Sequence, residues 1–177
     1  MAQNGVSMRA GEFRESVPSG VCRAVLSIVT LALVTGCTLI PEPGPDRDAE
    51  GAVTAEAETD AFSIEVGDCI SDPGVSSVTD ITVLPCDELH DFEAFAATEM
   101  PDGDYPGAPA AITAASEFCA REFTGYVGVE YDASVLEMLY FYPVEESWNT
   151  ANDREILCFV AEPGETPVTG SLRNARR

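Results

Sequence analysis

One histidine stands among acidic residues in the stretch CDELHDFE, and acid–base chemistry could be built there. His90 is the only histidine of the chain, and Asp91 follows it directly. A histidine and a carboxylate at hydrogen-bond distance make a general acid/base pair, and the same groups could ligate a metal ion. The sequence offers no nucleophile beside them, and strand alternation would turn His90 and Asp91 to opposite faces. We therefore interpret His90 as a structural or partner-contacting residue.

A second cluster combines the only tryptophan with an arginine. Trp148 lies shortly before Arg154 in the stretch SWNTANDREILC. In so acidic a chain we expect Arg154 to form an ion pair, with Asp153 or with a carboxylate across a sheet. Trp148 with Tyr140 or Tyr142 could form a platform for a sugar ring or a peptide. The interpretation we favour is that Trp148 closes the core between two strands.

The cysteines indicate disulfides. Apart from Cys22 in the leader and the lipidated Cys37, both described below, four cysteines remain, and an even number in an exported domain predicts two bonds, for which three connectivities exist. We favour Cys69 with Cys86, which would tie two neighbouring strands, and Cys119 with Cys158, which would pin a helix to a sheet. A zinc site is the competing interpretation. It is disfavoured because there is no Cys-x-x-Cys pair and only one histidine, so we expect no metal or other cofactor.

Several classes of function are disfavoured. The chain has no P-loop, no Gly-x-Ser-x-Gly, no His-Glu-x-x-His and no EF-hand loop. We therefore expect a protein that is not an enzyme. Asp and Glu number 31 against 9 Lys and Arg, for a net charge of −22, and all 9 are arginine. Nucleic acid and anionic lipid head groups are poor partners for such a surface.

The elements that must position these residues follow from periodicity. Alternating apolar residues predict a strand from Phe62, in which Phe62, Ile64 and Val66 share a face. Apolar residues at helical spacing predict a helix with Ile112, Ala115, Phe118, Cys119 and Phe123 on one face. The predicted strands are 62–70, 80–86, 90–100, 135–143 and 154–162, and the predicted helix is 108–123.

The connections complete the predicted fold. We expect the strands at 80–86 and 90–100 to form an antiparallel pair joined near 85–91, PDGDYPG to be a loop, and NTAND to be a polar turn. The fold class is α+β: a mainly antiparallel sheet of about four to five strands with one packed helix, stapled by disulfides.

The N-terminus reads as an export signal. Three arginines precede an apolar segment, Ala24 to Val34, that is much shorter than the about 20 residues a transmembrane helix needs. The segment ends in Val34-Thr-Gly-Cys37, which resembles a bacterial lipobox. We therefore expect residues 1–36 to be a signal peptide and Cys37 to carry the lipid, on the extracytoplasmic face of the cell membrane. An ordinary signal peptide with a chance cysteine is the alternative, and Met8 could equally be the start.

Composition then divides the rest of the chain. Residues 38–61 are rich in Pro, Ala, Glu and Asp and hold few large apolar side chains. Such a segment cannot bury enough surface to offset its ordering entropy. We expect residues 37–61 to be the lipidated cysteine and an acidic flexible tether, residues 62–173 to be the folded domain, and residues 174–177 to be a basic tail.

Several motifs, in order, resemble the septum formation domain of high-GC Gram-positive bacteria. They are VGDCI, VLPCDELHDFEAFA, PDGDYPG, FCAREFTGYVG, WNTANDREILCFV and PVTGSLR. Leu89 stands where the family often has proline, and AND replaces a common GD before the arginine. The resemblance implies a link to cell division and a membrane-tethered protein, and it brings no catalytic residues. It implies that Asp68, His90, Arg154 and Gly170 are shared fold determinants.

The leading hypothesis is a lipid-anchored, extracytoplasmic binding or scaffold domain linked to septum formation. Its partners would be the membrane, through the lipid, and an unidentified extracytoplasmic protein or cell-wall component. One alternative is a wall-modifying hydrolase that uses His90 with a nearby carboxylate. Another is a lipoprotein that binds a solute or an ion.

Overall fold

The computed structural model of the protein describes residues 44–74 and 81–177. Within these residues six strands form one sheet, in which every neighbouring pair is antiparallel. The α+β prediction is confirmed, with six strands in place of four to five. The order across the sheet is β1 (Ala57–Thr59), β3 (Ile81–Leu84), β2 (Cys69–Ile70), β4 (Phe92–Glu99), β6 (Glu155–Ala161) and β5 (Glu137–Phe141).

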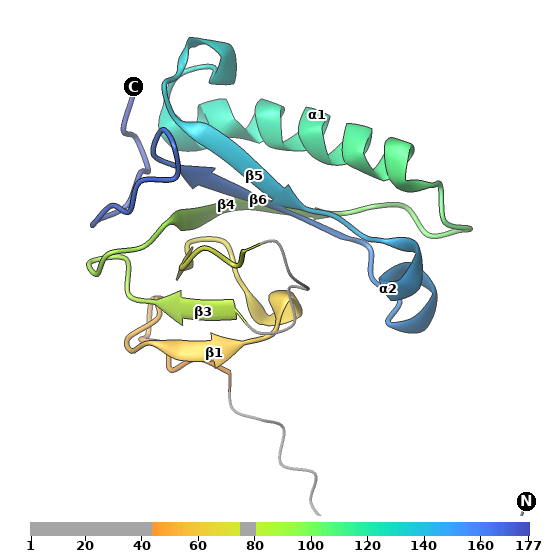
Figure 1. The fold of residues 1–177 in the computed structure, drawn as a ribbon, viewed down its shortest axis with the longest axis horizontal. Helices are drawn as coiled ribbons and strands as arrows, with labels where there is room; N and C mark the ends of the chain where they lie inside the picture. The colour runs from red at the N-terminus through yellow and green to blue at the C-terminus, as the bar shows by residue number, and fades with distance from the viewer. Residues whose placement is uncertain (1–43, 75–80) are drawn as a thin grey trace, which may run out of the picture. The chain divides into compact units, whose positions relative to one another are not determined.

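One long helix, α1 (Ala108–Val127), lies against β4, β5 and β6 (Figure 1). Its N-terminal cap is Gly107, and it ends at Gly128, whose positive φ of 90° suits glycine and whose N–H bonds back to the Thr124 carbonyl. The buried residues of the helix are Ala111, Ala115, Cys119, Phe123, Tyr126 and Val127. Of the predicted face, Ala115, Cys119 and Phe123 are buried, whereas Ile112 is 38% exposed and Ala111 is buried in its place.

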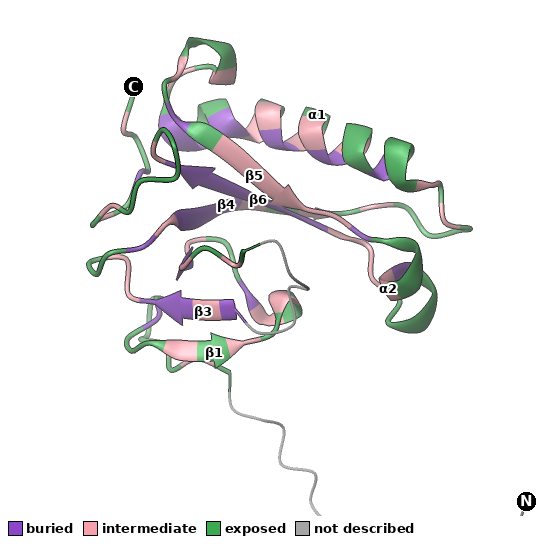
Figure 2. Cartoon of the chain, in the orientation of Figure 1, coloured by how far each residue is buried: buried purple, intermediate pink, exposed green. Residues whose placement is uncertain are grey.

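Strand β6 is buried on both faces, as Figure 2 shows by its colour. On one face Cys158 and its alternate neighbours pack with the residues of α1. On the other face Leu157 and Phe159 share a hydrophobic cluster with Val83 of β3. The sheet therefore curls, so that its β1-β3-β2 half closes the face opposite to α1 (Figure 1). Burial on both sides explains the nearly continuous apolar sequence of β6.

The strand predicted from Phe62 to Ile70 is wrong except for its last two residues. Residues Ala61–Ser63 form a 3-10 turn, because the Asp60 carboxylate accepts the Phe62 N–H at 2.8 Å and caps it. Phe62 and Val66 are 59% and 46% exposed, whereas Ile64 is buried. Only β2 remains of the predicted strand. The hydrogen bond that the Asp60 carboxylate accepts therefore sets the local conformation, and the alternating apolar residues do not form a strand.

The predicted pairing of β3 with β4 is also wrong. Strand β2 lies between them, with Cys69 opposite Leu84 of β3 on one side and Glu93 of β4 on the other. The connection near 85–91 therefore carries the chain past β2. The sequence did not indicate this strand order, because the pairing of β2 with both neighbours depends on contacts between separate segments.

The domain extends beyond the predicted boundaries at both ends. Residues of the supposed tether pack on the sheet: β1 pairs with β3, and Val53 is 7% exposed. At the other end, Asn174 and Arg176 donate their N–H groups to the carbonyls of Tyr126 and Val127. The tether and tail boundaries are thus corrected to a fold that includes residues 44–61 and 174–177. Cys37 and the leader lie outside the described residues.

A short second helix, α2 (Glu145–Thr150), stands where the chain was expected to enter a polar turn. The Ser147 hydroxyl accepts the Val144 N–H at 3.2 Å, and Glu145 and Glu146 occupy the first turn, where the helix dipole favours negative charge. No helix within residues 44–74 and 81–177 combines the length and apolar character needed to span a bilayer.

Candidate functional site

Both favoured disulfides are confirmed. Cys69 of β2 is bonded to Cys86, which follows β3, with their Cα atoms 5.3 Å apart. Cys119 of α1 is bonded to Cys158 of β6, with a Cα separation of 5.5 Å. The Cys69 and Cys86 sulfurs lie near the Glu93 carboxylate, an arrangement that could resemble a metal site. Because those sulfurs are bonded to each other, they supply no thiolate ligands, and the zinc interpretation loses its donors.

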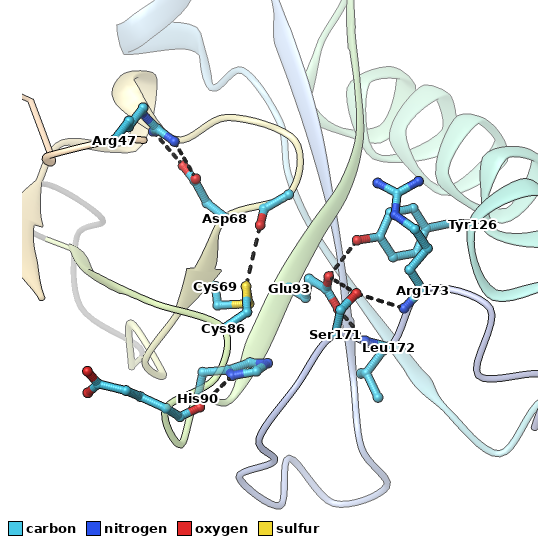
Figure 3. Close-up of a disulfide and its surroundings, with 12 residues drawn as sticks. Arg47, Asp68, Cys69, Cys86, His90, Glu93, Tyr126, Ser171, Leu172 and Arg173 are labelled. Carbon is cyan, nitrogen blue, oxygen red and sulfur yellow. Dashed lines mark hydrogen bonds and ion pairs between the residues drawn. A yellow bond between two sulfur atoms is a disulfide. The ribbon is translucent and has the colours of Figure 1, made fainter. Parts of the chain in front are cut away.

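Asp68 holds the N-terminal arm against the domain. Its carboxylate is 2% exposed and accepts two hydrogen bonds from the Arg47 guanidinium, at 2.6 and 2.8 Å (Figure 3). It also accepts the Glu65 N–H at 2.7 Å. The hydrogen bond to Asp68 raises the pKa of Arg47, against the effect of burial. Sequence reasoning placed Arg47 in a tether and so missed this pair.

His90 is 1% exposed and lies at the turn before β4. Its Nδ1 is 3.0 Å from the Glu88 carbonyl (Figure 3). Its backbone exchanges two hydrogen bonds with Val168, at 3.0 and 2.9 Å. Nε2 is buried and has no hydrogen-bond partner among the described residues. The Asp91 carboxylate instead accepts the Asp72 N–H at 2.8 Å. The structure therefore does not assemble the acid/base pair of His90 and Asp91.

Glu93 is the buried acid that sequence reasoning missed. Its carboxylate, in a residue 2% exposed, accepts hydrogen bonds from the Tyr126 hydroxyl at 2.6 Å, the Ser171 hydroxyl at 2.5 Å and the Leu172 N–H at 2.6 Å (Figure 3). Burial raises the pKa of Tyr126, and its hydrogen bond to Glu93 raises it further. The Arg173 guanidinium lies 4.2 Å from the centre of the Tyr126 ring. Glu93 therefore joins β4, α1 and the C-terminal segment.

Trp148 and Arg154 meet, but they form no open platform. The Arg154 guanidinium stacks 3.7 Å from the centre of the Trp148 ring, and Trp148 is 4% exposed. The indole N–H donates to the Gly103 carbonyl at 2.9 Å, and the Tyr105 ring lies 5.7 Å away. Trp148 thus fixes the loop before α1 to α2. Tyr140 and Tyr142 are half-buried and contact each other, at 6.2 Å between ring centres.

Arg154 forms an ion pair as expected, but with Asp102 and not with Asp153. The Arg154 Nε lies 3.3 Å from Asp102, in the loop before α1, without hydrogen-bond geometry. Arg154 Nη1 donates to the carbonyls of Trp148 and Asp153, at 3.1 and 2.8 Å. The Asp153 carboxylate instead accepts the Ser147 hydroxyl at 2.7 Å. The arginine therefore ties three chain segments together.

A shallow pocket of about 350 Å³ lies elsewhere, where α1 meets the turn that follows it. None of the sequence-predicted site residues lines it. Its lining residues are Ala120, Arg121, Thr124, Glu130, Tyr131 and Asp132. The predicted motif residues therefore contact other segments of the domain and do not line this pocket.

The fold and these side-chain contacts define an α+β domain that is cross-linked by two disulfides and whose motif side chains hold its segments together. The chain belongs to the septum formation family: its residues 53–176 match the family model described as "Septum formation". The match begins before β1 and includes the C-terminal segment, in agreement with the corrected domain boundaries. The searches of curated proteins and of solved structures returned no match.

Proposed function

We propose that the protein is a lipid-anchored, extracytoplasmic domain that binds a partner in the cell envelope during septum formation. Membership of the septum formation family supports the link to cell division. The two disulfides support an oxidising compartment, since such bonds persist mainly outside the cytosol. The lipobox at Val34 to Cys37 supports the anchor.

A binding role is supported by how the motif side chains are used, and this observation carries the proposal. Asp68, Glu93 and Arg154 satisfy their charges through partners inside the domain. A catalytic group needs reach to a substrate, and the Glu93 carboxylate, in a residue 2% exposed, already accepts three hydrogen bonds inside the domain. These groups therefore give the domain rigidity, and recognition falls to its surface.

The anchor would keep the domain near the membrane. The folded part begins by Arg47, which pairs with Asp68, so only the stretch between Cys37 and Arg47 links the lipid to the domain. A fully extended chain advances at most about 3.6 Å per residue, so this stretch spans at most about 35 Å. The partner should therefore lie in the periplasm-like space or wall layer next to the membrane.

Metabolic labelling with an alkyne palmitate tests the anchor. We expect the wild-type chain to be labelled and found with membranes, and Cys37→Ala to be unlabelled and released from them. Phe62→Ala, a change at an exposed residue, serves as the labelled control.

Depletion in growing cells tests the division role, with a fluorescent fusion to follow the protein. We expect enrichment at septa, and misplaced or delayed septa on depletion that wild type restores and Cys37→Ala does not. Normal septation on depletion, with the fusion spread evenly over the envelope, would contradict the proposal.

A further inference from the structure

The sheet has one long edge that is open. Within the described part of the chain, β5 is the last strand of the order and pairs only with β6, from Glu137 opposite Ala161 to Phe141 opposite Leu157. Among residues 44–74 and 81–177, none forms a backbone hydrogen bond to Glu137–Phe141 from the other side. Because backbone groups of an edge strand alternate in direction, about half of those in β5 point away from the sheet.

The two edges of the sheet differ. β1 has 3 residues, and the carboxylate of its Glu58 accepts the Thr82 hydroxyl at 2.7 Å. β5 has 5 residues, of which only Glu137 is charged, and it holds no proline or basic residue. Soluble proteins protect edges with short strands, charges or proline, so β1 is protected and β5 is not. An unprotected edge is the template on which an extended peptide adds a strand.

The side chains of β5 suit an added strand. Met138, Leu139, Tyr140 and Phe141 are all half-buried, in contrast to the buried residues of β6. Met138 and Tyr140 pack on the side of α1, and Leu139 and Phe141 pack on the opposite side. Each face of β5 thus offers apolar or aromatic neighbours to cross-strand side chains.

Charge around β5 indicates the kind of partner. The sequence between Arg121 and Arg154 has no basic residue. Exposed carboxylates stand after β5 at Glu145 and Glu146, whereas Glu130 and Asp132 before it line a pocket together with Arg121. A second copy of the chain would bring the same carboxylates against them, and like charges at an interface oppose association. A basic strand would be attracted.

We propose that the free edge of β5 binds an extended, basic segment of another protein by strand addition. The inference rests on the proposed binding function and names its partner class. Main-chain hydrogen bonds to β5 provide the docking, and the carboxylates select lysine or arginine side chains on the added strand.

Synthetic peptides test this on the full chain in detergent. The probe is a capped nine-residue peptide of alternating arginine and valine. One control replaces arginine with glutamate, and another keeps the arginines but N-methylates alternate backbone amides. We expect the basic peptide to bind about tenfold or more tightly than either control. Hydrogen exchange should slow in 137–142 and remain unchanged in β1.

A charge variant sharpens the test. Glu145→Gln with Glu146→Gln should weaken binding of the basic peptide by about threefold or more at low salt. Its matched control, Glu50→Gln with Glu56→Gln, removes two exposed charges near the other edge and should change binding less.

Three results would overturn the inference. They are equal binding of the N-methylated peptide, unchanged exchange in β5, and protection of β5 by self-association without peptide, which sedimentation would detect. Failure here with septal enrichment intact would reject strand addition alone, whereas loss of envelope location would reject the proposed function.

Discussion

The Tyr126 hydroxyl donates a hydrogen bond of 2.6 Å to the buried Glu93 carboxylate, and 33 positions separate the two residues. This bond joins α1 to β4. The same carboxylate receives two donors from the C-terminal segment, at Ser171 and Leu172. One acid thus connects three segments that are remote in the sequence.

Glu93→Gln should destabilise the domain by about 1 to 3 kcal/mol, because an amide nitrogen cannot accept the bonds that a carboxylate oxygen accepts. Tyr126→Phe should cost about 1 to 2 kcal/mol, since it removes one donor. The double variant should lose less than the sum, as expected for residues in contact. Urea denaturation measures all three, with Glu117→Gln on the exposed side of α1 as control. Wild-type stability in Glu93→Gln would contradict this role.

Stability should fall at high pH because of Tyr126. Burial and the bond to Glu93 raise the pKa of Tyr126, so the folded protein keeps a proton that the unfolded chain releases above about pH 10. The contribution is present below that pH and is lost as pH rises above it. Denaturation at pH 8 to 11 should show a steeper loss for wild type than for Tyr126→Phe. Parallel curves would refute the assignment.

Arg47→Ala should destabilise the domain by about 3 kcal/mol, because it leaves the buried Asp68 carboxylate without its cation. The matched control is Arg121→Ala, which breaks an exposed pair with Glu122 and should cost about 0 to 1 kcal/mol. Thermal and urea unfolding measure both. A chain shortened to begin at Phe62 should be less stable still, since it also lacks β1. If the shortened chain were as stable as the full chain, the result would support the prediction that residues 37–61 include a flexible tether.

Arg154→Lys should loosen the loop at Pro101–Gly107. A lysine cannot stack its charge over Trp148 as a guanidinium does or keep the same fork of donors, so we expect a loss of about 1 to 2 kcal/mol. Trp148 is the only tryptophan, so its fluorescence reports directly on this site. Emission should shift to longer wavelength in Arg154→Lys and remain unchanged in Arg121→Lys. An unchanged spectrum and stability would show that the stacking contributes little.

Local patterns were sufficient for much of the fold. β3, β4, β6 and α1 were predicted because several successive residues repeat at strand or helix spacing. The disulfide pairs were inferred correctly because each pair joins two predicted elements that were expected to lie against each other. Patterns failed where few residues are involved, as in β1, or where a side-chain cap redirected the chain, as at Asp60.

The site was less accessible to sequence reasoning. His90 was interpreted as a structural or partner-contacting residue, and the structure places it at 1% exposure with Nδ1 3.0 Å from the Glu88 carbonyl. Glu93 carries no local signal in the sequence that marks it as buried. Its burial depends on Ser171 and Leu172, which lie far along the chain. Arg47 was missed for the same reason, because its partner lies in another segment and its own stretch has the composition of a linker.

By itself, the sequence determined the properties that depend on neighbouring residues: the strong negative charge, the α+β class and the main strands and helix. The tertiary structure alone decided which polar groups are buried, that residues 44–61 belong to the fold, and that β5 forms the open edge. The reason is physical. Burial, ion pairing and strand order depend on contacts between distant segments, and only the folded chain brings those segments together.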